Sequence, residues 1–116
     1  MRNFRPVEQA ALSNPELPRG AGRGKLLYLD AGSGLAGDML VAALLDLGVP
    51  EAALAEGLAG LGLRGYTLAH GRVLRSSLSG RHFDVQVQDA QPARDYRAIV
   101  SLLTAAESLS EGARKL

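Results

Sequence analysis

Residues 26–39 constrain the fold of this chain more than any other segment. A short apolar run, a glycine-rich loop and the start of a long apolar stretch follow one another there. The apolar run at 26–29 has the length and composition of a buried β-strand. Asp38 stands just before the apolar stretch and is predicted to be the N-cap of a helix, because its carboxylate can accept unpaired amides of the first turn. Strand, glycine loop and helix in this order direct backbone N–H groups at a ligand above the loop.

The loop also fits the dinucleotide-binding pattern G-x-G-x-x-G, but its surroundings do not. That pattern requires an acidic residue about twenty positions further on, at the end of a second strand. Here the position falls near Glu56, inside a predicted helix. Asp30 and Asp38 flank the loop, and two carboxylates repel a pyrophosphate. They suit a hard cation or amide donors better.

Residues 30–39 read D-x-x-S-G-x-x-G-D-M, and A-A-L-L-D-L-G-V-P follows at 42–50. This spelling resembles the N-terminal region of the LarC family, the nickel insertion proteins of the lactate racemase system. Gly32 lies outside the family spelling, so the dinucleotide pattern is read as accidental. The resemblance continues through 61–63, 75–80 and 95–99, and it covers residues 25–116.

The resemblance implies a function. LarC proteins are metallochelatases, classed as lyases, that insert nickel into a pyridinium bisthiocarboxylic acid mononucleotide with CTP hydrolysis, which completes the lactate racemase cofactor. A histidine-rich stretch of the family is replaced here by D-A-Q-P-A-R at 89–94. The later H-F-H-E-like motif and the CTP-binding region would follow Leu116. Nickel and CTP are therefore implied by the resemblance only, and this chain alone is not expected to be competent.

Two functions are open at this point. The first is the N-terminal domain of such a nickel chelatase, with the pyridinium mononucleotide as its ligand. The second is a non-catalytic interaction or scaffold module that needs a partner chain. The partner would be the remainder of the protein or a companion chain, and a homo-oligomer is also open.

The loop supplies the candidate ligand-binding residues, since strand ends and the loops after them are where α/β sheets bind ligands. The same residues have structural alternatives: a carboxylate or hydroxyl in such a loop often bonds a nearby amide. Spacing alone favours those structural roles, and the resemblance shifts the expectation towards binding without deciding between metal, nucleotide and organic ligand. The candidates are Asp30, Ser33, Gly34, Gly37 and Asp38.

Other polar residues are weaker candidates. Arg75 lies in a turn that matches the family and is the predicted phosphate contact, because a guanidinium can hold phosphate bidentately. His70 and His82 suit nickel chemically, but no third ligand is spaced to join them, so we do not expect a site there. The metal ligands stay unknown, with Asp30 and Asp38 as weak candidates.

The remaining pattern predicts an α/β domain in which helices cover a small sheet. The expected order is β-α-α-β-β-α, with the character of a split β-α-β (ferredoxin-like) unit that is incomplete at its C-terminus. The helices are expected at 39–47, closed by a left-handed Gly48, at 51–61 and after an Asp95 cap. Strands at 66–74 and 82–88 are expected to form an antiparallel hairpin around a polar turn at 75–80, with Phe83, Val85 and Val87 on one face. A capping box at 108–111 predicts one more helix.

The amino-acid composition excludes several classes of function. The chain has no cysteine, which excludes disulfides and thiolate metal sites. A net charge of +1 and 4% aromatic residues argue against nucleic-acid binding. No apolar run reaches the roughly 20 residues of a membrane span, so a cytoplasmic protein is expected. Residues 1–24 are predicted to be a flexible extension with a helical turn at 7–12, and residues 25–116 a single domain.

Overall fold

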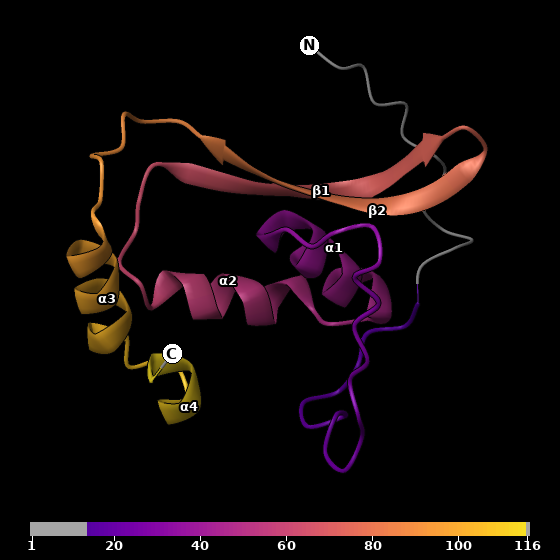
Figure 1. The fold of residues 1–116 in the computed structure, drawn as a ribbon, viewed down its shortest axis with the longest axis horizontal. Coiled ribbons are helices and arrows are strands. Elements are labelled where there is room, and N and C mark those ends of the chain that lie inside the picture. The colour runs from indigo at the N-terminus through magenta and orange to yellow at the C-terminus, as the bar shows by residue number, and fades with distance from the viewer. Residues whose placement is uncertain (1–13, 116) are drawn as a thin grey trace. The chain divides into compact units, whose positions relative to one another are not determined.

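The computed structural model describes residues 14–115, and the predicted helical turn at 7–12 lies outside them. It has mixed helices and a two-stranded sheet, which confirms the α/β class (Figure 1). From residue 37 onwards the order helix, helix, strand, strand, helix is the one predicted. The elements are α1 (Gly37–Leu47), α2 (Glu51–Ala59), β1 (Tyr66–Arg75), β2 (Leu78–Val87), α3 (Tyr96–Ala105) and α4 (Glu111–Arg114).

The chain divides into two compact units, which are described separately. Of the described residues, the first comprises 14–50 and Leu68–Asp84, and the second comprises Glu51–Thr67 and 85–115. The first unit thus holds α1 and most of the hairpin. The second holds the remaining helices and the open end of the hairpin.

The hairpin closes through a tight turn at Ser76 and Ser77. Both residues have positive φ, 47° and 68°, as a type I′ turn requires, and this turn matches the twist of the two strands. At the open end, Gln88 N donates to Gly65 O at 2.8 Å. The predicted antiparallel hairpin is confirmed. The predicted turn at 75–80 is too long, because two left-handed serines reverse the chain and let the strands continue to both sides of them.

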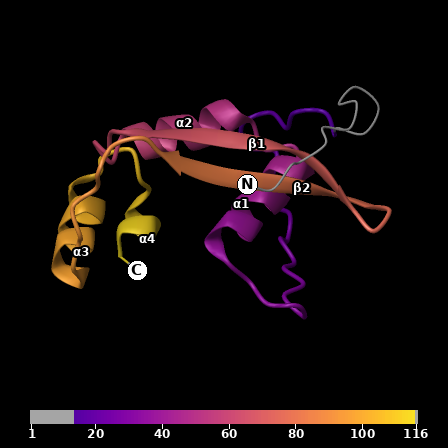
Figure 2. The same cartoon turned by 90° about the horizontal axis from the view of Figure 1, so that it is seen from above.

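The core of the first unit lies between α1 and the hairpin. Ala42 and Leu45 from α1 and Phe83 from β2 are buried, each with 6% of its surface exposed. Figures 1 and 2 both show α1 lying against the hairpin. Asp84, the next residue along β2, is exposed. Phe83 and Asp84 therefore follow the predicted alternation, and Phe83 anchors the helix. Val85 and Val87, predicted on the same face as Phe83, are 46% and 61% exposed, so the predicted buried face ends at Phe83.

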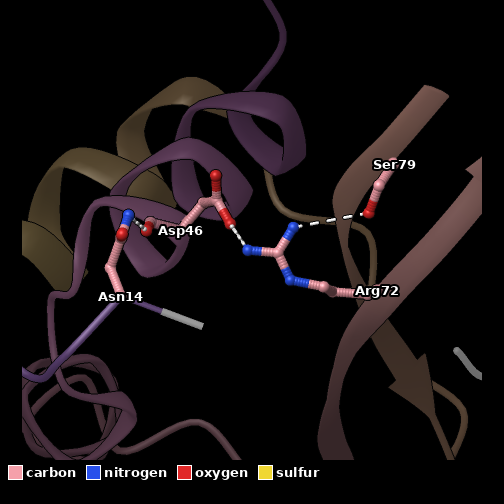
Figure 3. A network of polar contacts seen from close by, with 4 residues as sticks. All are labelled: Asn14, Asp46, Arg72 and Ser79. Atoms are coloured by element: carbon pink, nitrogen blue, oxygen red, sulfur yellow. Dashed lines mark hydrogen bonds and ion pairs between the residues drawn. The ribbon is translucent and has the colours of Figure 1, made fainter. Parts of the chain in front are cut away.

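A polar network also joins α1 to β1 (Figure 3). Arg72 Nη2 lies 2.8 Å from Asp46 Oδ1, and Arg72 Nη1 donates to Ser79 Oγ at 3.5 Å. The Arg72 side chain is 10% exposed and that of Asp46 is 41% exposed. On the other side, Asn14 Nδ2 donates to Asp46 O at 2.7 Å. A nearly buried guanidinium therefore has its charge matched by the last turn of α1.

Gly48 ends α1 in the left-handed conformation that the sequence predicts, with φ of 113°. Leu17 N donates to Gly48 O at 2.7 Å. A Cβ at position 48 would meet Pro15 O at 2.6 Å, much closer than real Cβ contacts. The glycine is therefore needed twice, for its φ and for the approach of residues 14–17 to the end of the helix.

In the second unit, side-chain caps start two helices. Asp95 accepts from Ala98 N at 2.8 Å, which confirms the predicted cap of α3. The cap of α4 is Ser110, which accepts from Ala113 N at 3.3 Å, and not Ser108. The Ser108 hydroxyl instead donates to Gly57 O of α2 at 3.3 Å. The predicted capping box at 108–111 is therefore wrong in its first residue. Ala106, at 1% exposure, is the buried apolar residue of this unit.

The predicted strand at 26–29 is wrong for this structure. These residues belong to no strand and their side chains are exposed, and in Figure 1 the trace that leads into α1 has no arrow. A strand is stable only beside another strand. Within residues 14–115 the sheet consists of β1 and β2, and the apolar run pairs with the free edge of neither. None of the helices within residues 14–115 has the length and hydrophobicity that a membrane span requires.

We predict that Gly48→Ala destabilises the chain by about 1–2 kcal/mol, because an alanine in the left-handed region is strained and its Cβ displaces the segment at Pro15. Urea unfolding monitored by circular dichroism measures this. Gly57→Ala is the control, since this helical glycine has open space around it and alanine is the better helix former. Equal stability of Gly48→Ala and the wild type would contradict the docking of residues 14–17.

A double-mutant cycle tests the charge pair. Arg72→Met and Asp46→Asn should show a coupling free energy of about 1 kcal/mol, because Arg72 is nearly buried whereas Asp46 is partly solvated. The control cycle uses Lys115 and Glu111, an ion pair with both side chains more than 70% exposed, for which coupling near zero is expected. If the coupling free energy within the Asp46 and Arg72 pair is as small as that within the control pair, this charge pair does not stabilise the packing of α1 on β1.

Candidate functional site

The loop before α1 is built from two overlapping turns. Asp30 Oδ1 accepts from Gly32 N at 3.2 Å, and Gly34 N donates to Ala31 O at 2.9 Å. Gly34 has φ of +94°, a conformation that L side chains rarely adopt. Asp30 therefore has the turn-capping role that the sequence leaves open, and Gly34 is required by the backbone.

Asp38 is not the N-cap that its position predicts. The helix begins at Gly37, so that Ala36 is the N-cap and has no side-chain bond, while Asp38 lies within the first turn. Its Oδ1 accepts from Met39 N at 2.8 Å. The carboxylate thus occupies the position at the positive end of the helix where an anion would bind. This arrangement disfavours a phosphate at the loop, as the mismatch with the dinucleotide pattern already indicated.

The whole loop is exposed from residue 31 to 39. The Ser33 hydroxyl makes no hydrogen bond within the described part of the chain. Among the described residues, nothing outside the adjoining backbone lies within 4 Å of where a Cβ would stand at Gly34 or Gly37. The loop therefore presents carboxylate and hydroxyl oxygens to solvent, and a ligand could approach its backbone closely at both glycines.

Residues 14–115 contain no group of three or more His, Cys, Asp or Glu side chains that could hold a metal ion. Asp30 and Asp38 would therefore need further ligands to retain one. His70 and His82 cannot supply them as a pair. Opposite residues of the hairpin share a face, and the turn at Ser76 and Ser77 sets His70 opposite Phe83, so that His82 lies on the other face.

Arg75 is the last residue of β1 and is exposed beside the hairpin turn. It belongs to the same unit as the loop, and its role in phosphate binding stays a prediction. Sequence reasoning missed the pairing of Asp46 with Arg72. The signal was present, since Asp46 is the single charge in the otherwise apolar stretch at 39–47.

The chain matches the model of one protein family, described as nickel insertion protein, over residues 27–116. A "putative nickel insertion protein" of Myxococcus xanthus is 41% identical over 93 residues, which are 78% of this chain and 24% of that protein. One of the same description from Thermomicrobium roseum is 48% identical over 82 residues, 70% of this chain and 20% of the relative. The pyridinium-3,5-bisthiocarboxylic acid mononucleotide nickel insertion protein of Geobacillus kaustophilus is 46% identical over 66 residues, 57% of this chain and 16% of the relative.

No solved structure matches the chain. The chain spans a quarter or less of the length of these curated relatives. The region matched by the family model begins within the apolar run before the loop and includes the loop, α1, the hairpin and the helices that follow. With most of its residues matched, this chain belongs to the nickel insertion protein family.

Proposed function

We propose that this chain forms the N-terminal domain of a cytoplasmic protein that loads nickel into pyridinium-3,5-bisthiocarboxylic acid mononucleotide, as a step towards the lactate racemase cofactor. The observation that carries the proposal is the family match over 27–116, which includes the motif at 30–39. The substrate is taken from the name of the relative in Geobacillus kaustophilus. Nickel is the cargo of this reaction and not a resident ion of the domain.

Within this proposal, the loop from Asp30 to Asp38 contacts the incoming metal or a part of the mononucleotide other than its phosphate. Two features support the role: the exposed carboxylates, each with one oxygen bonded to a backbone amide, and the open space at the glycines. Two carboxylates attract a divalent cation, while an imidazole-free site holds nickel weakly. Weak holding suits a metal that must be passed on. CTP hydrolysis, which the resemblance implies, belongs in this proposal to the part of the family proteins outside this chain.

A second candidate function, a non-catalytic module that needs a partner chain, is favoured by one observation. The described residues contain no group of three metal-binding side chains. In that case the loop has a structural role and the chemistry lies entirely in the partner.

A chimera separates the two functions. The chain replaces the matched region of the Geobacillus kaustophilus relative, and nickel insertion into the mononucleotide is followed by mass spectrometry. We expect an active chimera and a 10–100-fold slower Asp30→Asn, Asp38→Asn double variant, since a hydrogen bond or ligand contact to a charged group contributes about 1.5–3 kcal/mol.

The matched control is Asp84→Asn. Asp84 is exposed on β2, in the same unit as the loop, and its substitution should leave the rate unchanged. Loss of rate in both variants would assign the effect to net charge and not to the loop. A folded chimera that retains CTP hydrolysis but inserts no nickel would contradict the proposed function and favour the module. Full activity of the Asp30→Asn, Asp38→Asn double variant would show that the two carboxylates of the loop have no part in nickel insertion.

A further inference from the structure

The apolar run at 26–29 is exposed to an unusual extent. Leu26 is 88% exposed, Leu27 59%, Tyr28 79% and Leu29 47%. Soluble proteins rarely leave contiguous apolar side chains of this kind in contact with water, and such a patch marks an interaction site. These four residues are consecutive and directly precede the loop, so that whatever covers them also lies beside Asp30.

The pattern of the run indicates what would cover it. Successive residues of a strand point to opposite faces, so that four consecutive apolar residues give a strand that is apolar on both faces. Strands of this type lie inside a sheet, with neighbours on both edges and with both faces covered. β2 differs, because the buried Phe83 is followed directly by the exposed and charged Asp84.

The backbone of the run is available for pairing. Residues 26–29 belong to no strand, and just before them Lys25 N donates to Gly22 O at 3.1 Å, which closes a turn. Within residues 14–115 the sheet consists of β1 and β2 paired with each other. Polypeptide from outside the described chain is therefore needed to form a ladder on both edges of this run.

The relatives contain such polypeptide, since the matched region is a quarter or less of their length. We infer that residues 26–29 form an interior β-strand by pairing with the part of a nickel insertion protein that lies outside the matched region. A second copy of this chain fits less well, because two copies of the run would pair along one edge each and leave the other edges open. This inference rests on family membership and not on the nickel chemistry.

The pairing has a consequence for the site. Asp30 directly follows the run, so that the loop would lie at the end of an interior strand, where open α/β sheets bind ligands. The partner strands end or begin at the same edge and bring their own side chains to the exposed carboxylates. The missing ligands of the loop would then come from the polypeptide that completes the sheet.

Co-expression tests this inference without nickel or mononucleotide. The tagged chain is produced together with the untagged region of the Myxococcus xanthus relative that lies outside the match, and the two are purified by the tag and sized by light scattering. A one-to-one complex is expected. Hydrogen exchange at the amides of residues 26–29 should slow by about 100-fold or more in the complex relative to the chain alone.

Two variants probe the side chains and the backbone separately. Leu26→Asp places a charge on one covered face, and Tyr28→Pro removes an N–H that an interior strand must donate. Each should weaken the complex by about tenfold or more while leaving the circular dichroism of the chain unchanged, because neither residue is in a helix or strand of the chain alone. Leu78→Asp is the matched control: this leucine is 77% exposed at the start of β2, and its substitution should leave the complex intact.

Three results would overturn the inference. The first is failure of the wild-type chain to capture the region outside the match. The second is capture that neither Leu26→Asp nor Tyr28→Pro weakens. The third is a dimer of the chain that both variants dissociate, which would assign the run to a second copy. A complex that forms as expected but loads no nickel would leave this inference standing and contradict only the proposed function.

Discussion

The contact of α1 with the hairpin is the interaction on which the first unit depends. A two-stranded hairpin is marginally stable by itself and needs a helix or a third strand against its apolar face. Here Phe83 meets that need together with Ala42 and Leu45. Arg72 and Asp46 add a charge pair at the last turn of the helix. These contacts fix the position of α1, and the loop that precedes its first turn is therefore attached to a helix that is packed in place.

The small size of this core has a physical consequence. Among the described residues, only four apolar side chains fall in the buried class, three of them in the first unit and one in the second. Many large apolar side chains remain exposed, and burying one of them fully contributes about 1.5–3 kcal/mol. Much of the stabilisation that this composition allows is therefore not realised among the described residues. Polypeptide from the longer family proteins could supply it.

The loop before α1 is as incomplete as the core. The loop residues Asp30 and Asp38 each bond one backbone amide and remain exposed, while the described residues contain no three-ligand metal group. An exposed pair of carboxylates attracts a cation but does not define its geometry. In the proposed function nickel is the cargo, and exposed carboxylates without further ligands agree with a loop that forms one wall of a site completed by other polypeptide.

Local features of the chain were determined by its sequence. The left-handed end of α1 at Gly48, the cap at Asp95 and the alternation at Phe83 depend on neighbours within a few residues, and all were predicted. The sequence predicted Asp38 as the N-cap, which is wrong. The helix begins at Gly37, so Asp38 lies in its first turn. The strand at 26–29 failed for a different reason. The pattern of apolar residues indicates which side chains are more stable when buried. A strand, however, forms only where the tertiary structure places another backbone at hydrogen-bonding distance. The pairing of Asp46 with Arg72 was decided in the same way, because only the folded chain brings the end of α1 to β1.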